Sequence, residues 1–160
     1  MNTTQMEATA KFLSRLSDLY SNINNWVQPQ YLRVVRSNMK LNEEAYGKYD
    51  VEKLSIIDAN GKRIGELLPV GASVIGAEGR VDLIGDVDQE ILVYLDNGGP
   101  HFTTEIEAGG QQKRRTTPLY RGVEEDGRYW IEIRRLNRAR RLDQALFLDL
   151  LAEVSDHACC

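Results

Sequence analysis

Three acidic residues in the middle of the chain could together bind a divalent cation: Glu78, Asp82 and Glu90. Asp82 lies in an alternating stretch, Gly79–Ile84, and Glu90 opens a second, apolar stretch. Two such stretches joined by a short loop predict a β-hairpin. Mg²⁺ binds carboxylate oxygens and keeps several waters, so these acids would form a magnesium site if the hairpin brought them together. That site would belong to a metal-dependent, nuclease-like phosphodiesterase, or to a degenerate relic of one.

The stretch Gly79–Ile84 begins Gly-Arg-Val-Asp-Leu. It resembles the RecB-type branch of the PD-(D/E)XK nucleases, in which the pattern Gly-Arg-x-Asp-apolar precedes a second strand carrying an acid and a lysine. The resemblance covers this hairpin alone and implies that Asp82 binds the metal. The second stretch, Ile91–Asp96, contains no lysine to help activate water. The alternative interpretation is an ion pair of Arg80 with Asp82 or Glu90 on a half-exposed scaffold hairpin, without a cofactor.

A second group of reactive side chains is basic and could bind anions. Five arginines fall within residues 134–141: Arg134, Arg135, Arg138, Arg140 and Arg141. The wider segment 113–141 holds ten bases and four acids, a local charge of +6, and the net charge of −4 leaves −10 for the remainder. Guanidinium groups match the geometry of carboxylates and phosphates. We therefore expect either an acidic protein surface or a nucleic acid as the partner of these arginines.

The overall charge favours the protein partner. The sequence pI is near 5.3, whereas a dedicated nucleic-acid-binding domain is usually basic. A nucleic-acid-binding accessory domain using the 134–141 arginines remains the second alternative, and a homo-oligomer is left open. The C-terminal ligands His157, Cys159 and Cys160 are too closely spaced for a closed zinc site, so we expect a frayed tail.

The chain shows no complete catalytic set, which favours a non-catalytic protein-interaction module of the adaptor, chaperone-like or toxin-neutralising type. The N-terminal residues lack the pattern of a secretory signal, and the two cysteines are adjacent at the end of the chain. We therefore expect a cytoplasmic location. Apolar runs are only a few residues long, so no membrane association is expected.

The elements that position these residues can be predicted from periodicity. Apolar residues at steps of three and four predict a helix from about residue 5 to 27: Phe12, Leu13, Leu16, Leu19, Tyr20, Ile23 and Trp26. Pro29 should end this helix, because proline lacks the amide that would continue it. A second helix over 144–156, capped by Asp143, is apolar around most of its circumference and should be buried.

Between the helices, residues 31–134 alternate with a period of two and predict a largely antiparallel meander sheet. Asn60 and Gly61 indicate a hairpin with a type I′ turn, and Gly109–Thr117 is expected to be a mobile loop. At 160 residues, the chain is expected to form a single α+β domain with both helices packed on the sheet. The expected strands are Tyr31–Lys40, Lys53–Asp58, Arg63–Leu68, Gly79–Ile84, Ile91–Leu95, Phe102–Ile106, Leu119–Val123 and Arg128–Arg134.

Overall fold

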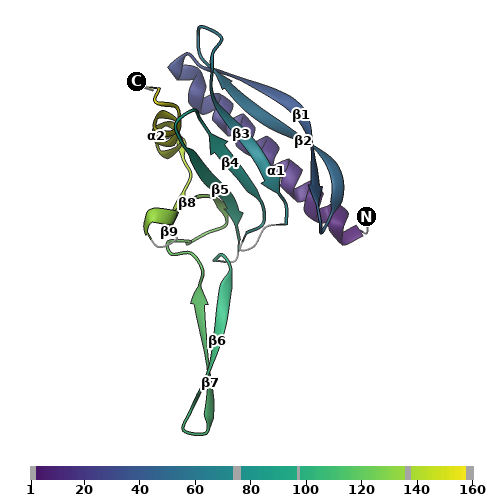
Figure 1. Ribbon diagram of the computed structural model, residues 1–160, viewed down its shortest axis with the longest axis vertical. Coiled ribbons are helices and arrows are strands. Elements are labelled where there is room, and N and C mark those ends of the chain that lie inside the picture. The colour runs from purple at the N-terminus through teal and green to yellow at the C-terminus, as the bar shows by residue number, and fades with distance from the viewer. Residues whose placement is uncertain (1–2, 74–76, 97, 136–137, 158–160) are drawn as a thin grey trace.

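The structure is a computed structural model that describes residues 3–73, 77–96, 98–135 and 138–157 (Figure 1). It confirms an α+β domain with an N-terminal helix, a largely antiparallel sheet and a C-terminal helix packed on the sheet. Helix α1 (Thr3–Val27) ends in a short 3-10 turn, η1 (Gln28–Gln30), that contains Pro29. Helix α2 (Gln144–Ser155) begins after Asp143, whose carboxylate accepts a 2.8 Å hydrogen bond from the Leu146 amide.

Among the described residues, seven strands form the main sheet, and every neighbouring pair is antiparallel. In spatial order they are β1 (Arg33–Glu43), β2 (Gly47–Ile57), β3 (Arg63–Gly71), β4 (Arg80–Ile84), β5 (Gln89–Leu95), β8 (Gly127–Glu132) and β9 (Arg138–Arg141). A separate two-stranded ribbon, β6 (His101–Ala108) and β7 (Gln111–Pro118), is inserted between β5 and β8. The sheet is therefore a meander interrupted by one projecting hairpin.

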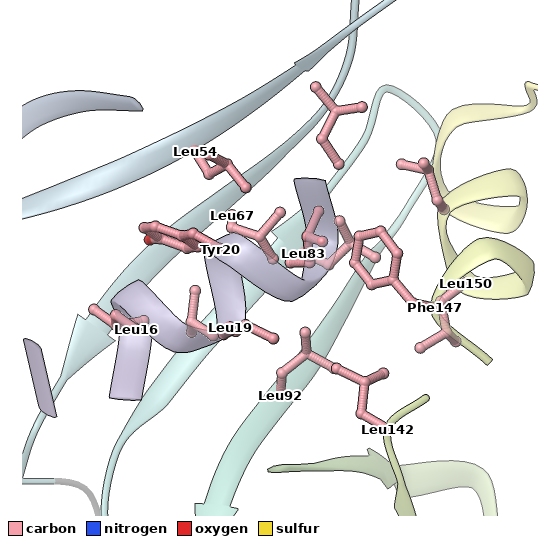
Figure 2. Close-up of a cluster of buried hydrophobic side chains, with 14 of the residues drawn as sticks. Leu16, Leu19, Tyr20, Leu54, Leu67, Leu83, Leu92, Leu142, Phe147 and Leu150 are labelled. Carbon is pink, nitrogen blue, oxygen red and sulfur yellow. The ribbon is translucent and has the colours of Figure 1, made fainter. Parts of the chain in front are cut away.

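Both helices cover the same face of the sheet and enclose the main core with it (Figure 2). Leu16 and Leu19 on α1 and Leu150 on α2 are buried, as their periodicity predicts. The Tyr20 hydroxyl, also on α1, donates a 2.7 Å hydrogen bond to the Glu52 carbonyl of β2. Close packing makes such a core sensitive to the loss of even one side chain. The strands contribute Leu54, Leu67, Leu83 and Leu92 to the same cluster.

A smaller apolar cluster lies on the other face, at the β8–β9 end of the sheet. Its buried members are Val93, Leu95, Tyr129, Ile131 and Ala139, and Tyr120 and Val123 pack against them. The segment that carries Tyr120 and Val123 joins β7 to β8, so it covers a strip of sheet that the helices do not reach. The Tyr129 hydroxyl fixes this segment by donating a 2.7 Å hydrogen bond to the Glu125 carbonyl.

Two local predictions are corrected, and one strand was not predicted. Gly109–Thr117, expected to be a mobile loop, contains most of β7, because Gly109 and Gly110 adopt φ angles of 63° and 77° and form the two-residue turn of a hairpin. Leu119–Val123 forms no strand and makes one isolated bridge, from Arg121 to Arg138. Strand β9, inside the arginine-rich segment, was not predicted at all.

The β2–β3 hairpin is confirmed, but its turn differs from the predicted type. Only Gly61 has a positive φ, of 81°, and Asn60 does not. The Asp58 carboxylate accepts hydrogen bonds of 2.9 Å from the amides of Asn60 and Lys62, so a side chain organises the turn. Within the described part of the chain, neither helix is long and apolar enough to cross a membrane.

Candidate functional site

The most exposed of the described strands are β6 and β7, which form the hairpin His101–Pro118 that we call the arm. Figure 1 shows it extending away from the sheet and both helices. Its two strands pair only with each other among the described strands, and every residue of β6 is exposed. A two-stranded hairpin is only marginally stable in water by itself, so an exposed hairpin of this length is an unusual feature of a folded chain.

The two faces of the arm differ in chemistry because side chains alternate along a strand. One face carries Phe102 and Ile106, whose exposed fractions are 51% and 47%. Cross-strand neighbours share a face, and Ile106 pairs with Lys113 while Thr104 pairs with Arg115. This face therefore combines two large apolar side chains with two cations, and we call it the apolar-basic face.

The opposite face of the arm is polar and carries the acids. Glu105 and Glu107 lie on it, together with Thr103. The Arg114 guanidinium, paired across the ribbon with Glu105, contacts that carboxylate at 3.2 Å. Both partners are largely exposed, so this ion pair contributes little to stability. The acidic face is thus partly neutralised within the arm, whereas no ion pair with a described residue is found for Lys113 or Arg115 on the apolar-basic face.

The five predicted arginines at 134–141 form the basic edge of the sheet. Arg134 and Arg135 lie in the 3-10 turn η2 (Ile133–Arg135), and Arg138, Arg140 and Arg141 lie on β9. This edge adjoins the base of the arm, because the Ala139 amide donates a 2.7 Å hydrogen bond to the carbonyl of Arg121. The structure therefore brings the basic edge into contact with the segment that joins β7 to β8.

Two arginines of the basic edge are engaged within the chain. Arg141 forms an ion pair with Glu125, and Arg135 contacts the Glu132 carboxylate at 3.3 Å. Arg140 lies over the Trp130 ring, 5.8 Å from its centroid. In the part of the chain that the structure describes, no ion pair is found for the remaining arginines of the edge, Arg134, Arg138 and Arg140. Arg134, Arg138 and Arg140 are exposed and thus best placed to meet a partner.

The structure separates the predicted magnesium ligands. Asp82 on β4 pairs with Ile91, whereas Glu90 on β5 pairs with Leu83. Paired residues share a face and neighbours along a strand alternate, so Asp82 and Glu90 lie on opposite faces of the sheet. Glu78 is exposed before β4, and its amide donates to the Tyr94 carbonyl. The convergence that a magnesium site requires is absent here, and no metal-binding group of three His, Cys, Asp or Glu side chains occurs among the described residues.

Asp82 instead forms the ion pair that was the alternative interpretation. Nε and Nη2 of Arg80 donate to its two carboxylate oxygens at 2.8 and 3.1 Å. These bonds raise the pKa of the Arg80 guanidinium. Asp82 is only 7% exposed, which corrects the expectation of a half-exposed pair. A two-pronged pair of this kind fixes the side chains of β4 and occupies one acceptor site on each carboxylate oxygen.

Glu90 lies on the helix-covered face and has a different partner. Its carboxylate accepts a 2.7 Å hydrogen bond from the indole nitrogen of Trp130 on β8. Burial raises the pKa of Glu90, and this hydrogen bond opposes the shift because it favours the ionised form. Glu90 therefore joins β5 to β8 as a hydrogen-bond acceptor with a structural role.

Of the three C-terminal residues considered as zinc ligands, Cys159 and Cys160 lie outside the described residues.

The arm was not predicted as a candidate site, although the sequence contains two signals for it. Phe102 and Ile106 share one face of a strand, and Gly109 and Gly110 are suited to a type I′ turn. Reading both signals together would have predicted a second strand after the glycines. The polar composition of Gln111–Pro118 concealed that strand, because β-propensity is judged from apolar and branched residues.

Comparison with known proteins gives no relative from which a function could be inferred: no protein-family model matches the chain, and neither the curated proteins nor the solved structures include a significant match.

Proposed function

We propose that this chain is a non-catalytic protein-interaction module whose arm binds a partner protein with an acidic surface. The observation that carries the proposal is the apolar-basic face, on which Phe102 and Ile106 are about half exposed. Burying a fully exposed side chain of this size is worth roughly 1.5–3 kcal/mol, so covering the exposed halves of both side chains is worth about the same. A partner that covered both would gain that free energy on binding.

The charges around the apolar pair indicate the chemistry of the partner. Lys113 and Arg115 share the face with Phe102 and Ile106, so a complementary surface would have an apolar centre and acidic rim. The exposed arginines of the basic edge, next to the base of the arm, would extend the same preference. An adaptor, chaperone-like or toxin-neutralising role fits a module of this kind. A cytoplasmic location is part of the proposal, because adjacent cysteines cannot cross-link the fold.

A nucleic acid is the second candidate partner, and the shape of the arm is the observation that favours it. A two-stranded β-ribbon can enter the major groove of DNA, and Lys113 and Arg115 could then contact phosphates. The net charge of −4 opposes this, because the rest of the chain would repel a long polyanion. We therefore rank the acidic protein first.

The experiment that tests the proposal compares the two faces of the arm. The variant Phe102→Ser/Ile106→Ser removes the apolar pair, and Thr103→Ala/Glu107→Gln makes the same number of changes on the opposite face. Proteins retained from lysate of the source cells by the tagged wild-type chain would be quantified for each variant. We expect one retained protein to be lost from the first variant, with affinity reduced about 100-fold, and kept by the second.

Equal retention by both variants would contradict the proposal. The nucleic-acid alternative is tested in parallel with duplex and single-stranded oligonucleotides at two salt concentrations. Binding that weakens steeply with salt and is lost in Lys113→Gln/Arg115→Gln would replace the protein partner with a nucleic acid. Retention of the untagged chain by its tagged copy, lost in the first variant alone, would identify a second copy of this chain as the partner.

A further inference from the structure

A pocket unrelated to the arm lies between α1 and the β5–β8–β9 end of the sheet. Its volume is about 280 Å³, near the lower end of the range for small-molecule sites. Helix α1 contributes Arg15, Asp18 and Trp26 to its wall, and the strands contribute Tyr94 and Arg128. The pocket thus combines two aromatic rings with charged side chains, a composition suited to orienting a small ligand.

Two cations meet at one aromatic ring in this pocket. The Arg15 guanidinium lies 3.8 Å from the Tyr94 ring centroid, and that of Arg128 lies 5.6 Å from the same centroid. Each gains from the negative face of the ring, but the two positive charges repel each other. Burial and the charge of Arg15 together lower the pKa of Arg128 to about 10.

Arg128 also lacks part of its hydrogen bonding. Among the described residues, its Nη1 atom is shielded from solvent and has no hydrogen-bond partner. A shielded donor on a charged group costs free energy when it is unpaired, so the positive charge of Arg128 is only partly compensated within the described chain. The positive charge of Arg128 is shared over the whole guanidinium. An anion in the pocket would therefore neutralise that charge without contacting Nη1 itself.

We propose that this pocket binds a small molecule through its carboxylate group, held by Arg15 and Arg128, with the body of the ligand against Trp26 and Tyr94. A guanidinium matches a carboxylate through two parallel hydrogen bonds. Arg141, Asp18 and Asp126 also line the pocket, so the lining carries three cations and two anions, a balance that favours a monoanionic carboxylate over a dianionic phosphate. The volume fits a ligand with a single ring.

The test uses benzoate as the probe and the tryptophan indole N–H signals in NMR as the readout. The chain has two tryptophans, and Trp130 bonds to Glu90 outside the pocket, so its signal is an internal control. We expect benzoate to shift the Trp26 signal in a saturable way and to leave that of Trp130 unchanged. Benzamide, which has the same shape without the charge, should shift neither.

Variants assign the effect to the two arginines. Arg128→Met and Arg15→Gln should each weaken benzoate binding about tenfold or more, since each removes charged hydrogen bonds. Arg36→Gln is the matched control: Arg36 also lies over a tyrosine ring, that of Tyr20, but is exposed and outside the pocket. Should Arg128→Met fail to fold, Arg15→Gln decides the question alone.

Two further probes fix the ligand class. Inorganic phosphate bound more tightly than benzoate would overturn the carboxylate assignment, as would no Trp26 shift at the solubility limit of benzoate or shifts that survive both arginine variants. A short peptide ending in phenylalanine, with a free or amidated C-terminus, identifies the source of the carboxylate. Tighter binding of the free-acid peptide than of benzoate supports the site and assigns it to a protein C-terminus, and the reverse order supports a free small acid.

Discussion

The sheet body and the arm follow the same alternation of side chains but use it differently. In the body, Leu67 and Leu83 point towards the helices and are completely buried. In the arm, Phe102 and Ile106 have equivalent positions along a strand but remain about half exposed. The body therefore derives its stability from its apolar face, whereas the arm keeps an apolar face available at a cost. This difference separates residues that hold the fold from residues that are free to bind.

The largest effect is expected in the body, at the contact of α2 with the sheet. Leu150 is 2% exposed, and Leu150→Ala should reduce the free energy of unfolding by about 2–5 kcal/mol, through lost burial and the cavity left behind. Denaturant or thermal unfolding measures this loss. Truncation at Leu142 with little change in melting temperature would show that α2 is dispensable and would break the distinction between body and arm.

A smaller loss is expected at the ion pair on β4. Asp82→Ala leaves the Arg80 guanidinium without its partner in a partly exposed position, where water screens part of the charge, so the cost should be about 1 kcal/mol. Arg80→Ala/Asp82→Ala should recover part of this loss, because it also removes the unpaired charge. A magnesium-dependent nuclease activity that disappears in Asp82→Ala would contradict the structural role assigned to this pair.

The next effect depends on pH and arises at Glu90. Because the pKa of Glu90 is raised in the folded state, its ionised form destabilises the fold relative to its protonated form. Wild-type stability at this site is highest below the unfolded pKa and decreases as pH rises through the folded pKa. Glu90→Gln keeps an acceptor for Trp130, so its stability relative to wild type should improve from acidic to neutral pH. A relative stability that fell over this range would reverse the assigned sign.

The smallest effect on stability is expected in the arm. Phe102→Ser/Ile106→Ser changes side chains that are about half exposed, so the free energy of unfolding should change by less than about 0.5 kcal/mol. Partner binding should nevertheless be lost. A large loss of stability in this variant would show that the arm packs on the body in solution, and the apolar-basic face would then be part of the core.

The apolar periodicity of the sequence predicted the sheet body and its helices well, because burying one face of an element imposes that periodicity. Most of the apolar stripe of α1 is buried as its spacing predicts, and so are Phe147 and Leu150 in the helix expected over 144–156, whereas Leu13 is 36% exposed and Trp26 is only partly buried. The arm was harder, because a strand with no buried face carries no apolar period: Gln111–Pro118 reads as a loop although it pairs along its whole length.

The predicted metal ligands Asp82 and Glu90 are separated for a different physical reason, which is register. Ile84 pairs with Gln89 across a loop of four residues, and this offset places Asp82 and Glu90 on opposite faces. A shift of one residue would have placed them on the same face. The offset is fixed by contacts distant in sequence: the amides of Val87 and Asp88 donate to the Val154 carbonyl at the end of α2. The sequence of the hairpin alone contains no signal for that constraint.

The measurement that tests the central claim most directly is photo-crosslinking from adjacent positions of the arm. A photoreactive phenylalanine analogue at position 102 lies on the apolar-basic face, and the same analogue in place of Thr103 lies on the acidic face. The account predicts a strong crosslink to one protein partner from position 102 and little from position 103. Equal crosslinking from both positions, or none from position 102 with a partner that still binds, would contradict it.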